Sequence, residues 1–246
     1  LDHFEIPQKP TSLHAHNEAG RIGAVLTALE EGKDVALVSD AGTPLVSDPG
    51  ERLVAAVAEA GHRVEAVPGA SALLGALTVA GFRTERVLFL GFLPRKVGAR
   101  RKLLESQIGR PETVVVFESP HRVAKTLCDV VDVLGDRGAC LARELTKRHE
   151  EVLRGPASEL AAALAEAPPK GECALVIEGA SEQEALDAVA WSDAEVNRAL
   201  EERLAAGASV KDAAADLAGR TGRARRTLYA RAIELRKAST DGSEAT

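Results

Sequence analysis

Two short loops of small and polar residues have the composition of a ligand cradle. The first, Asp40–Pro44, follows the apolar run VALVS, and the second, Pro68–Ala72, follows another apolar run. Small side chains let a ligand approach the backbone, and the helical pattern after each loop would offer unpaired N–H groups to an anion. Both loops also fit ordinary tight turns between a strand and a helix. Neither matches the G-x-G-x-x-G or the P-loop pattern, so their spacing does not name the ligand.

Two runs of basic residues stand out against the formal net charge of −6. The segment Arg95–Lys102 contains no acidic residue, and Arg220–Lys237 contains only Glu234. Because phosphate contacts dominate non-specific affinity for nucleic acids, these runs are candidate nucleic-acid surfaces; a solvated, charged helix face explains the second run equally well. Aromatic residues make up only 3% of the chain, so base stacking is not expected to dominate. The predicted contact residues are Arg95, Lys96, Arg100, Arg101, Arg225 and Arg226.

The composition is that of a globular protein without membrane spans. The 246 residues are 45% hydrophobic and 28% charged, and no apolar run approaches the roughly 20 residues of a spanning helix. The three cysteines form no C-x-x-C pair, so neither a disulfide framework nor a metal site is predicted, and a cytoplasmic location is expected. Because the chain opens at Leu1 and contains no Met, we expect its natural start to lie upstream.

Strand and helix patterns alternate along most of the chain and predict an α/β fold with a mostly parallel sheet. Helical patterns follow Asn17, Gly50, Ser71, Arg100, His121 and Pro156. Several strand patterns are apolar at consecutive positions, which is typical of strands covered on both faces. The strand patterns cover residues 35–39, 63–69, 86–92, 113–119, 139–145, 150–155 and 172–179.

A change of composition after residue 180 predicts a separate C-terminal domain. Three short amphipathic patterns, joined by brief turns, indicate a helix-turn-helix-like unit. The basic cluster after Phe92 suggests the boundary between two α/β lobes. The predicted organisation is a first lobe over 1–92, a second lobe over 93–180, a linker over 181–191, a helical domain over 192–237 and a disordered tail over 238–246.

Six motifs, in order, resemble the tetrapyrrole-methylase-like family of S-adenosylmethionine-dependent enzymes. They read LVSDAGTPLVSDPG, VPGASALLGAL, FLGFLPRK, VVVFESPHRV, LARELTKRHEEVLRG and KGECALVIEG, and the likeness spans roughly residues 14–180. The resemblance implies two α/β lobes with the methyl donor in a cleft between them. It also implies an earlier first strand and a Pro-Ile-Gly-Asn-type loop, which this sequence does not contain. The implied donor contacts are Ala41, Gly42, Thr43, Val46, Ser71, Ala72, Glu118 and Leu145.

The motifs are most similar to those members of the family that 2′-O-methylate a cytidine ribose in the decoding region of 16S rRNA. This implies a homodimeric enzyme that acts on 16S rRNA in the assembled 30S subunit. Methylation of a corrin or porphyrin precursor is the alternative within the family. A non-catalytic DNA-binding regulator that uses the C-terminal helices is the third reading, and it leaves the two lobes unexplained.

For methyl transfer to a hydroxyl, the protein must align the oxygen and assist the loss of its proton. The segment RELTKRHEE, after a strand pattern, supplies suitable groups, and we take Lys147 and Glu144 as the catalytic candidates, together with Lys96. Lys147 would act as a fixed positive charge, or as a base if it were desolvated. A solvated charged loop or a structural ion pair would produce the same residue pattern.

Overall fold

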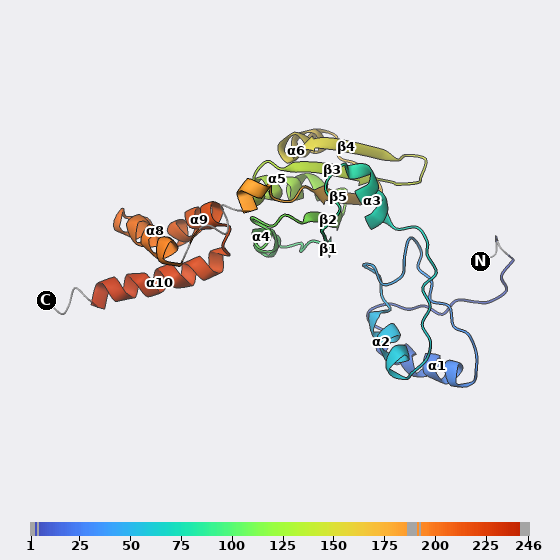
Figure 1. The fold of residues 1–246 in the computed structure, drawn as a ribbon. Helices are drawn as coiled ribbons and strands as arrows, with labels where there is room; N and C mark the ends of the chain where they lie inside the picture. The colour runs from blue at the N-terminus through green and yellow to red at the C-terminus, as the bar shows by residue number, and fades with distance from the viewer. Residues whose placement is uncertain (1–2, 4, 186–190, 192, 242–246) are drawn as a thin grey trace. The chain divides into compact units, whose positions relative to one another are not determined.

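The computed structural model describes residues 3, 5–185, 191 and 193–241, and the side chains only as far as Arg236 in the last helix. Much of the predicted linker and the end of the predicted tail lie outside these residues. The chain divides into two compact units, Leu1–Ala72 and Leu73–Thr246, which are described separately. Figure 1 shows the order of the helices and strands.

The first unit contains two helices, α1 (Glu18–Glu30) and α2 (Glu51–Glu59). The carboxylate of Glu18 is buried and accepts a hydrogen bond of 3.1 Å from the backbone N–H of Leu53, in the first turn of α2. A carboxylate at this position satisfies an N–H group that has no partner within the helix and interacts favourably with the helix dipole. One side chain of α1 therefore caps α2.

The strands predicted at 35–39 and 63–69 are not formed. Both segments are irregular, and none of the residues described before Ala72 belongs to a strand. A strand is stable only when its N–H and C=O groups pair with a neighbour, and these two segments pair neither with each other nor with another described segment. Their apolar side chains are accordingly exposed, Val38 at 67% and Val67 at 89%.

The second unit is built around a five-stranded sheet in the order β1-β2-β5-β3-β4. Only β1 and β2 are parallel, and the other three neighbouring pairs are antiparallel, so the prediction of a mostly parallel sheet is wrong. The turn over 144–150 between β3 and β4 is too short for the crossover that a parallel pair requires. The strands are β1 (Val87–Phe92), β2 (Thr113–Glu118), β3 (Gly138–Arg143), β4 (Glu151–Pro156) and β5 (Cys173–Ile177).

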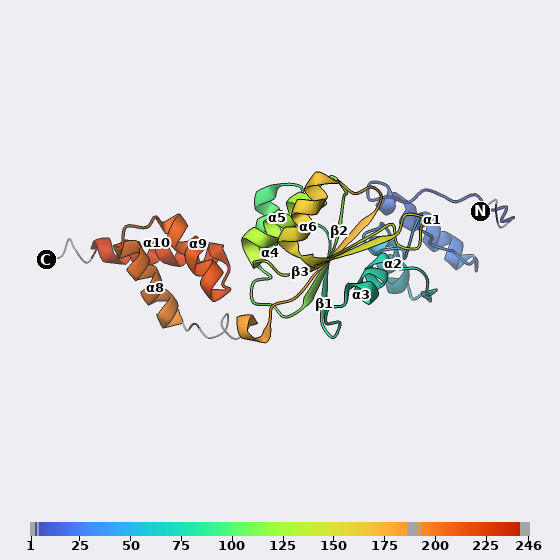
Figure 2. The same ribbon diagram turned by 90° about the horizontal axis from the view of Figure 1, so that it is seen from above.

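Helices cover both faces of this sheet (Figure 2). Along β2, Val114 and Val116 join the core under α4 (Val97–Glu105), α5 (Val123–Leu134) and α6 (Ala157–Glu166). Val115, which points to the opposite face, joins the core under α3 (Ala72–Ala80). The continuous apolar runs of the sequence are thus explained by burial on both sides. Because β1 is hydrogen-bonded to β2, the predicted lobe boundary after residue 92 falls at the end of a strand of this sheet.

The C-terminal residues form the predicted three-helix domain. Its helices are α8 (Asp193–Ala205), α9 (Val210–Thr221) and α10 (Arg225–Asp241), and α10 continues into the segment predicted as a disordered tail. Leu200, Leu217 and Leu228, one from each helix, meet in a core with almost no exposed surface. No described helix is long and apolar enough to cross a membrane.

Candidate functional site

The two predicted ligand loops lie against each other in the first unit. Thr43 Oγ1 donates a hydrogen bond of 3.0 Å to the carbonyl oxygen of Ala70. Gly42 lies beside the same carbonyl, and a Cβ atom at this glycine would be 3.7 Å from Ala70 O. The structure therefore brings the loop that carries Ala41, Gly42 and Thr43 next to the loop that carries Ser71 and Ala72.

The backbone of the first loop is strained on both sides of Val46. Leu45 has φ of +71° and Ser47 has φ of +64°, values that non-glycine residues seldom adopt. Each such residue costs about 1–3 kcal/mol, and residues of this kind cluster at ligand-binding sites. Val46 itself is half-buried. The strain supports the prediction that this loop binds a ligand.

In the second unit, two of the three predicted catalytic residues, Lys147 and Glu144, lie together where β3 ends and β5 begins, while Lys96 lies directly before α4. Lys147 Nζ donates hydrogen bonds of 3.0 Å to Glu144 Oε1 and to Glu172 Oε2. Glu144 Oε1 also accepts a bond of 2.9 Å from the backbone N–H of Glu172. Glu144 and Thr146 have φ of +50° and +65°. A strained turn after β3 and the start of β5 thus hold one ammonium group between two carboxylates.

These contacts decide the protonation states in the cluster. The hydrogen bonds from Lys147 to Glu172 and Glu144 raise the pKa of this lysine above its usual 10.5. The bonds that Glu144 accepts, first from the Glu172 backbone and then from Lys147, lower the pKa of this carboxyl group. At neutral pH the lysine is therefore an ammonium ion and the glutamate a carboxylate. The geometry favours a fixed positive charge over a lysine that acts as a base.

Glu172 and Gly171 belong to the cluster but were not predicted. Gly171 has φ of +84°, and a Cβ atom there would overlap the carboxyl group of Glu144. The glycine therefore permits the close approach of this carboxylate. The sequence contains one signal for the pair, a glycine followed by an acid directly before a strand pattern, but it does not reveal which distant side chain lies there.

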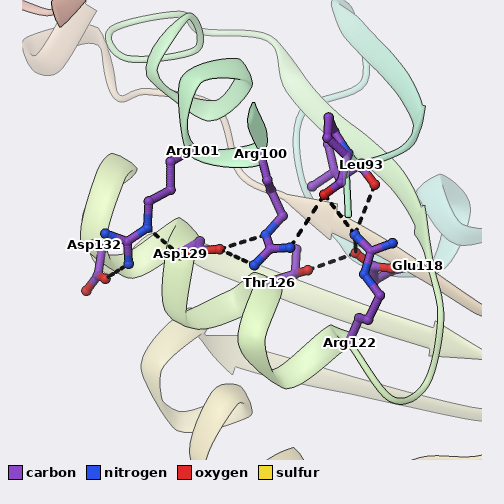
Figure 3. A network of polar contacts seen from close by, with 9 residues as sticks. Leu93, Arg100, Arg101, Glu118, Arg122, Thr126, Asp129 and Asp132 are labelled. Atoms are coloured by element: carbon purple, nitrogen blue, oxygen red, sulfur yellow. Dashed lines mark hydrogen bonds and ion pairs between the residues drawn. The ribbon is translucent and has the colours of Figure 1, made fainter. Parts of the chain in front are cut away.

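The other two predicted donor contacts of this unit have packing roles in the structure. Leu145 packs with the core under α3, and its Cδ1 atom would lie 3.3 Å from a Cβ placed at Gly75. The side chain of Glu118 is fully buried. Its Oε2 atom accepts a bond of 2.8 Å from Thr126 Oγ1 and lies 3.2 Å from Arg122 Nη2, while Oε1 accepts the N–H of Ser119 (Figure 3). The Glu118 carboxylate is thus occupied by protein groups.

The first basic run is only partly a free surface. Arg100 is buried, and its guanidinium group binds Asp129 of α5, with Nε 2.6 Å from Oδ2. Arg101 binds Asp129 and Asp132 (Figure 3). The prediction that Arg100 contacts RNA is therefore wrong, because its positive charge is neutralised in the interior, and Arg101 is engaged in the same network. Arg95 and Lys96 are exposed, and no partner is recorded for either side chain among the described residues.

The second basic run also contains both paired arginines and arginines without a recorded ion pair. Arg223 binds Asp193 and the carbonyl oxygen of Trp191, and Arg231 donates a bond of 2.8 Å to Asn197 Oδ1. Arg226 is exposed at the start of α10 and Arg225 is half-buried. Neither of these two has a recorded ion pair with a described residue. In the described part of the chain, no group of three His, Cys, Asp or Glu side chains is arranged to hold a metal ion.

Comparison with known proteins finds two family models in the chain. Residues 2–161 match the family model of the tetrapyrrole (corrin/porphyrin) methylases, and residues 191–236 match the RsmI C-terminal HTH domain. A relative from Synechocystis named ribosomal RNA small subunit methyltransferase I is 42% identical over 96% of this chain and 84% of its own length. One from Mesorhizobium japonicum with the same name is 43% identical over 98% of this chain and 81% of its own length.

Solved structures show a similar fold at lower sequence identity. The crystal structure of the methyltransferase CobJ matches with a TM-score of 0.54 and 19% identity. The match covers 72% of this chain and 79% of CobJ. At this identity the likeness concerns the fold alone.

Proposed function

Because this chain belongs to the tetrapyrrole methylase family, in the group named ribosomal RNA small subunit methyltransferase I, we propose that it methylates small-subunit ribosomal RNA. The acceptor in this proposal is the ribose 2′-oxygen of a cytidine in the decoding region of 16S rRNA, within the 30S subunit. The observation that carries it is the presence of both family matches in one chain, together with relatives of that name over nearly its whole length. A cytoplasmic homodimer is the form that we expect.

The loops of the first unit fit the methyl donor S-adenosylmethionine. The donor supplies a methyl group on a sulfonium, which makes the carbon reactive. Its amino-acid end and its ribose need backbone donors and acceptors, and its adenine needs apolar walls. The proposed backbone contacts are at Gly42, Thr43 and Ser71, and the half-buried side chain of Val46 offers apolar surface. The full proposed set is Ala41, Gly42, Thr43, Val46, Ser71 and Ala72, with Leu145 as a further apolar contact and Glu118 restricted to contacts through its backbone.

In the second unit, Lys147 is proposed to stabilise negative charge on the attacking oxygen. Transfer forms the bond between the 2′-oxygen and the methyl carbon, breaks the bond between sulfur and that carbon, and releases the hydroxyl proton. An ammonium ion close to the oxygen favours this loss because it lowers the pKa of the hydroxyl. Glu144 and Glu172 hold the ammonium group in place. The cluster is exposed, so the proton is released to solvent.

The RNA-binding residues in this proposal are the basic side chains that the protein itself leaves free. They are Arg95 and Lys96 before α4 and Arg225 and Arg226 at the start of α10. Each would bind backbone phosphate, which fixes orientation without reading sequence. Lys96 also remains a further catalytic candidate in this proposal.

Transfer of labelled methyl from S-adenosylmethionine to 30S particles that lack the modification tests this function. We expect incorporation into 16S rRNA at one cytidine ribose, and none into particles that already carry the modification. The same assay includes a corrin or porphyrin precursor and duplex DNA. Transfer to the tetrapyrrole but not to RNA would replace the proposal by the alternative within the family. Sequence-specific DNA binding without any transfer would support a regulator.

A further inference from the structure

The segment that carries Arg95 and Lys96 is bound on its inner side by a half-buried arginine, Arg122. Arg122 Nη2 donates hydrogen bonds of 2.9 Å to the carbonyl oxygen of Leu93 and 3.1 Å to that of Pro94 (Figure 3). Leu93 is itself 2% exposed, so the segment is anchored at its first residue. The next two residues, Arg95 and Lys96, are exposed. The loop therefore has a fixed side, which faces α5, and a free side, which carries two positive charges.

Arg122 is in turn held by the carboxylate of Glu118. Its Nη2 atom lies 3.2 Å from Glu118 Oε2, and Thr126 donates to the same oxygen. The planar guanidinium group makes several directed hydrogen bonds at once, which a flexible ammonium group does less well. Charge-assisted bonds of this kind are stronger than bonds between neutral groups, and burial reduces their exchange with water. The two carbonyl groups of the loop are thus fixed to β2 and α5.

A second arginine approaches the same loop from α4. Arg100 Nη1 lies 3.5 Å from the carbonyl oxygen of Pro94, a weak contact, while its Nε atom binds Asp129 at 2.6 Å. Arg100 and Arg122 thereby place two guanidinium groups on one backbone carbonyl. A loop that needed only to connect β1 with α4 would be adequately solvated by water. In the structure, the carbonyl groups on the inner side of this loop instead face Arg100 and Arg122, whose charges are paired with Asp129 and Glu118.

We propose that Arg122 is a positioning residue for the RNA substrate: by fixing the carbonyls of Leu93 and Pro94, it orients Arg95 and Lys96 toward the substrate backbone. The proposal rests on the function proposed above. It assigns Arg122 no contact with the reacting atoms, since its guanidinium group is bound by the protein. A displacement of about 1 Å in a positioning group is sufficient to cost up to a hundredfold in rate, so the effect is measurable.

The test uses the full chain with two substitutions, Arg122→Met and Arg122→Lys. The first removes all three contacts, and the second keeps a positive charge beside Glu118 while it loses the planar fork. For R122M we expect the KM for 30S particles to rise about tenfold, while the KM for S-adenosylmethionine stays within about twofold. R122K should recover part of the loss. Amide hydrogen exchange at Arg100, whose N–H donates to the carbonyl oxygen of Lys96 at the end of the loop, should accelerate about tenfold in R122M.

Arg154→Met is the matched control, because Arg154 likewise donates from its guanidinium group to a backbone carbonyl oxygen, that of Val79, and is not among the proposed donor, catalytic or RNA contacts. It should leave the KM for 30S particles and the exchange of the Arg100 amide unchanged. The positioning role is overturned if wild type methylates RNA while R122K and R154M show the same KM and the same exchange as wild type. It is also overturned if R122M raises the KM values for RNA and donor equally. Absence of methylation by wild type would instead refute the proposed function.

Discussion

At the scale of single residues, Lys147 has the most specific surroundings in the candidate site. Its ammonium group is bound by two carboxylates, and both contacts raise its pKa. The sequence identified Lys147 and Glu144 from residue type and position. It left open whether the lysine is a base or a fixed charge, because the answer depends on Glu172, whose position next to Lys147 exists only in the folded chain. The raised pKa favours the fixed charge.

The protonation state of Lys147 leads to a pH prediction. Because its folded pKa is raised, the charged form and the stabilisation from its pairing are fully present below its ordinary pKa of 10.5 and are lost only as pH rises through the higher folded value. The kcat for RNA methylation should therefore show no ionisation of Lys147 below pH 10.5. Lys147→Met should lower kcat about a hundredfold with little change in the KM for the donor.

Lys125→Met is the control for charge, because Lys125 is exposed on α5 and has no recorded partner among the described residues. It should keep the activity of wild type. A kcat that rises with pH in wild type, and loses this rise in K147M, would show that the lysine works as a base and would contradict the fixed-charge role.

At the scale of elements, Gly171, two residues before β5, leaves room for the Glu144 carboxyl group. Gly171→Ala places a methyl group where the Glu144 carboxyl lies, on a backbone with φ of +84°. We expect G171A to lose about tenfold in activity, because Glu144 must move away from Lys147. Gly207→Ala is the matched control: φ is +88° and no heavy atom lies within 4 Å of the added Cβ. Methyl-transfer assays and thermal unfolding of both variants check this.

Both substitutions introduce backbone strain of about 1–2 kcal/mol at a positive φ. G171A also displaces the Glu144 carboxyl group, so its free energy of unfolding should fall further than that of G207A. Only G171A should lose activity. Equal activity of the two variants would mean that the position of Glu144 does not matter for the reaction.

Helices and strands could be predicted from the sequence where local interactions form them, and not where they depend on partners distant in the sequence. Strands such as Thr113–Glu118 and helices such as α5 were predictable, because their apolar patterns are local and strong. The segments 35–39 and 63–69 have the same local pattern but no partner in the structure, and a strand pattern does not reveal whether a partner exists. The direction of β4 was predictable in principle, since residues 144–150 cannot hold a crossover helix. The partner of Arg100 was not, because Asp129 lies on another helix.

At the scale of the whole molecule, a formal net charge of −6 coexists with two runs of basic residues, and several arginines of these runs, among them Arg100, Arg101 and Arg223, are paired with carboxylates. At the start of α10, Arg225 and Arg226 escape this pairing and lie where the helix dipole already favours anions. Replacing both by Ala should weaken RNA binding more than donor binding. The slope of log K against log salt for RNA should fall by about 2, because two phosphate contacts are lost.

Arg198→Ala together with Arg203→Ala removes the same charge from the same domain and serves as the control. Both side chains are exposed on α8 and are paired with acids, Arg198 with Glu202 and Arg203 with Asp216. This variant should bind RNA with nearly the salt slope of wild type. Equal losses in the two double variants, or equal losses of RNA and donor binding in R225A/R226A, would count against a specific RNA surface at α10.

The core of the helical domain shares no residue with the two clusters that sandwich the sheet. Because the helical domain and the sheet are stabilised by separate groups of buried side chains, we expect them to unfold at different temperatures. Calorimetry on this chain would then record more than one endotherm. A substitution in α10 would lower the unfolding temperature only of the endotherm to which Leu217 and Leu228 contribute. A single midpoint fitted to the whole chain would hide this change.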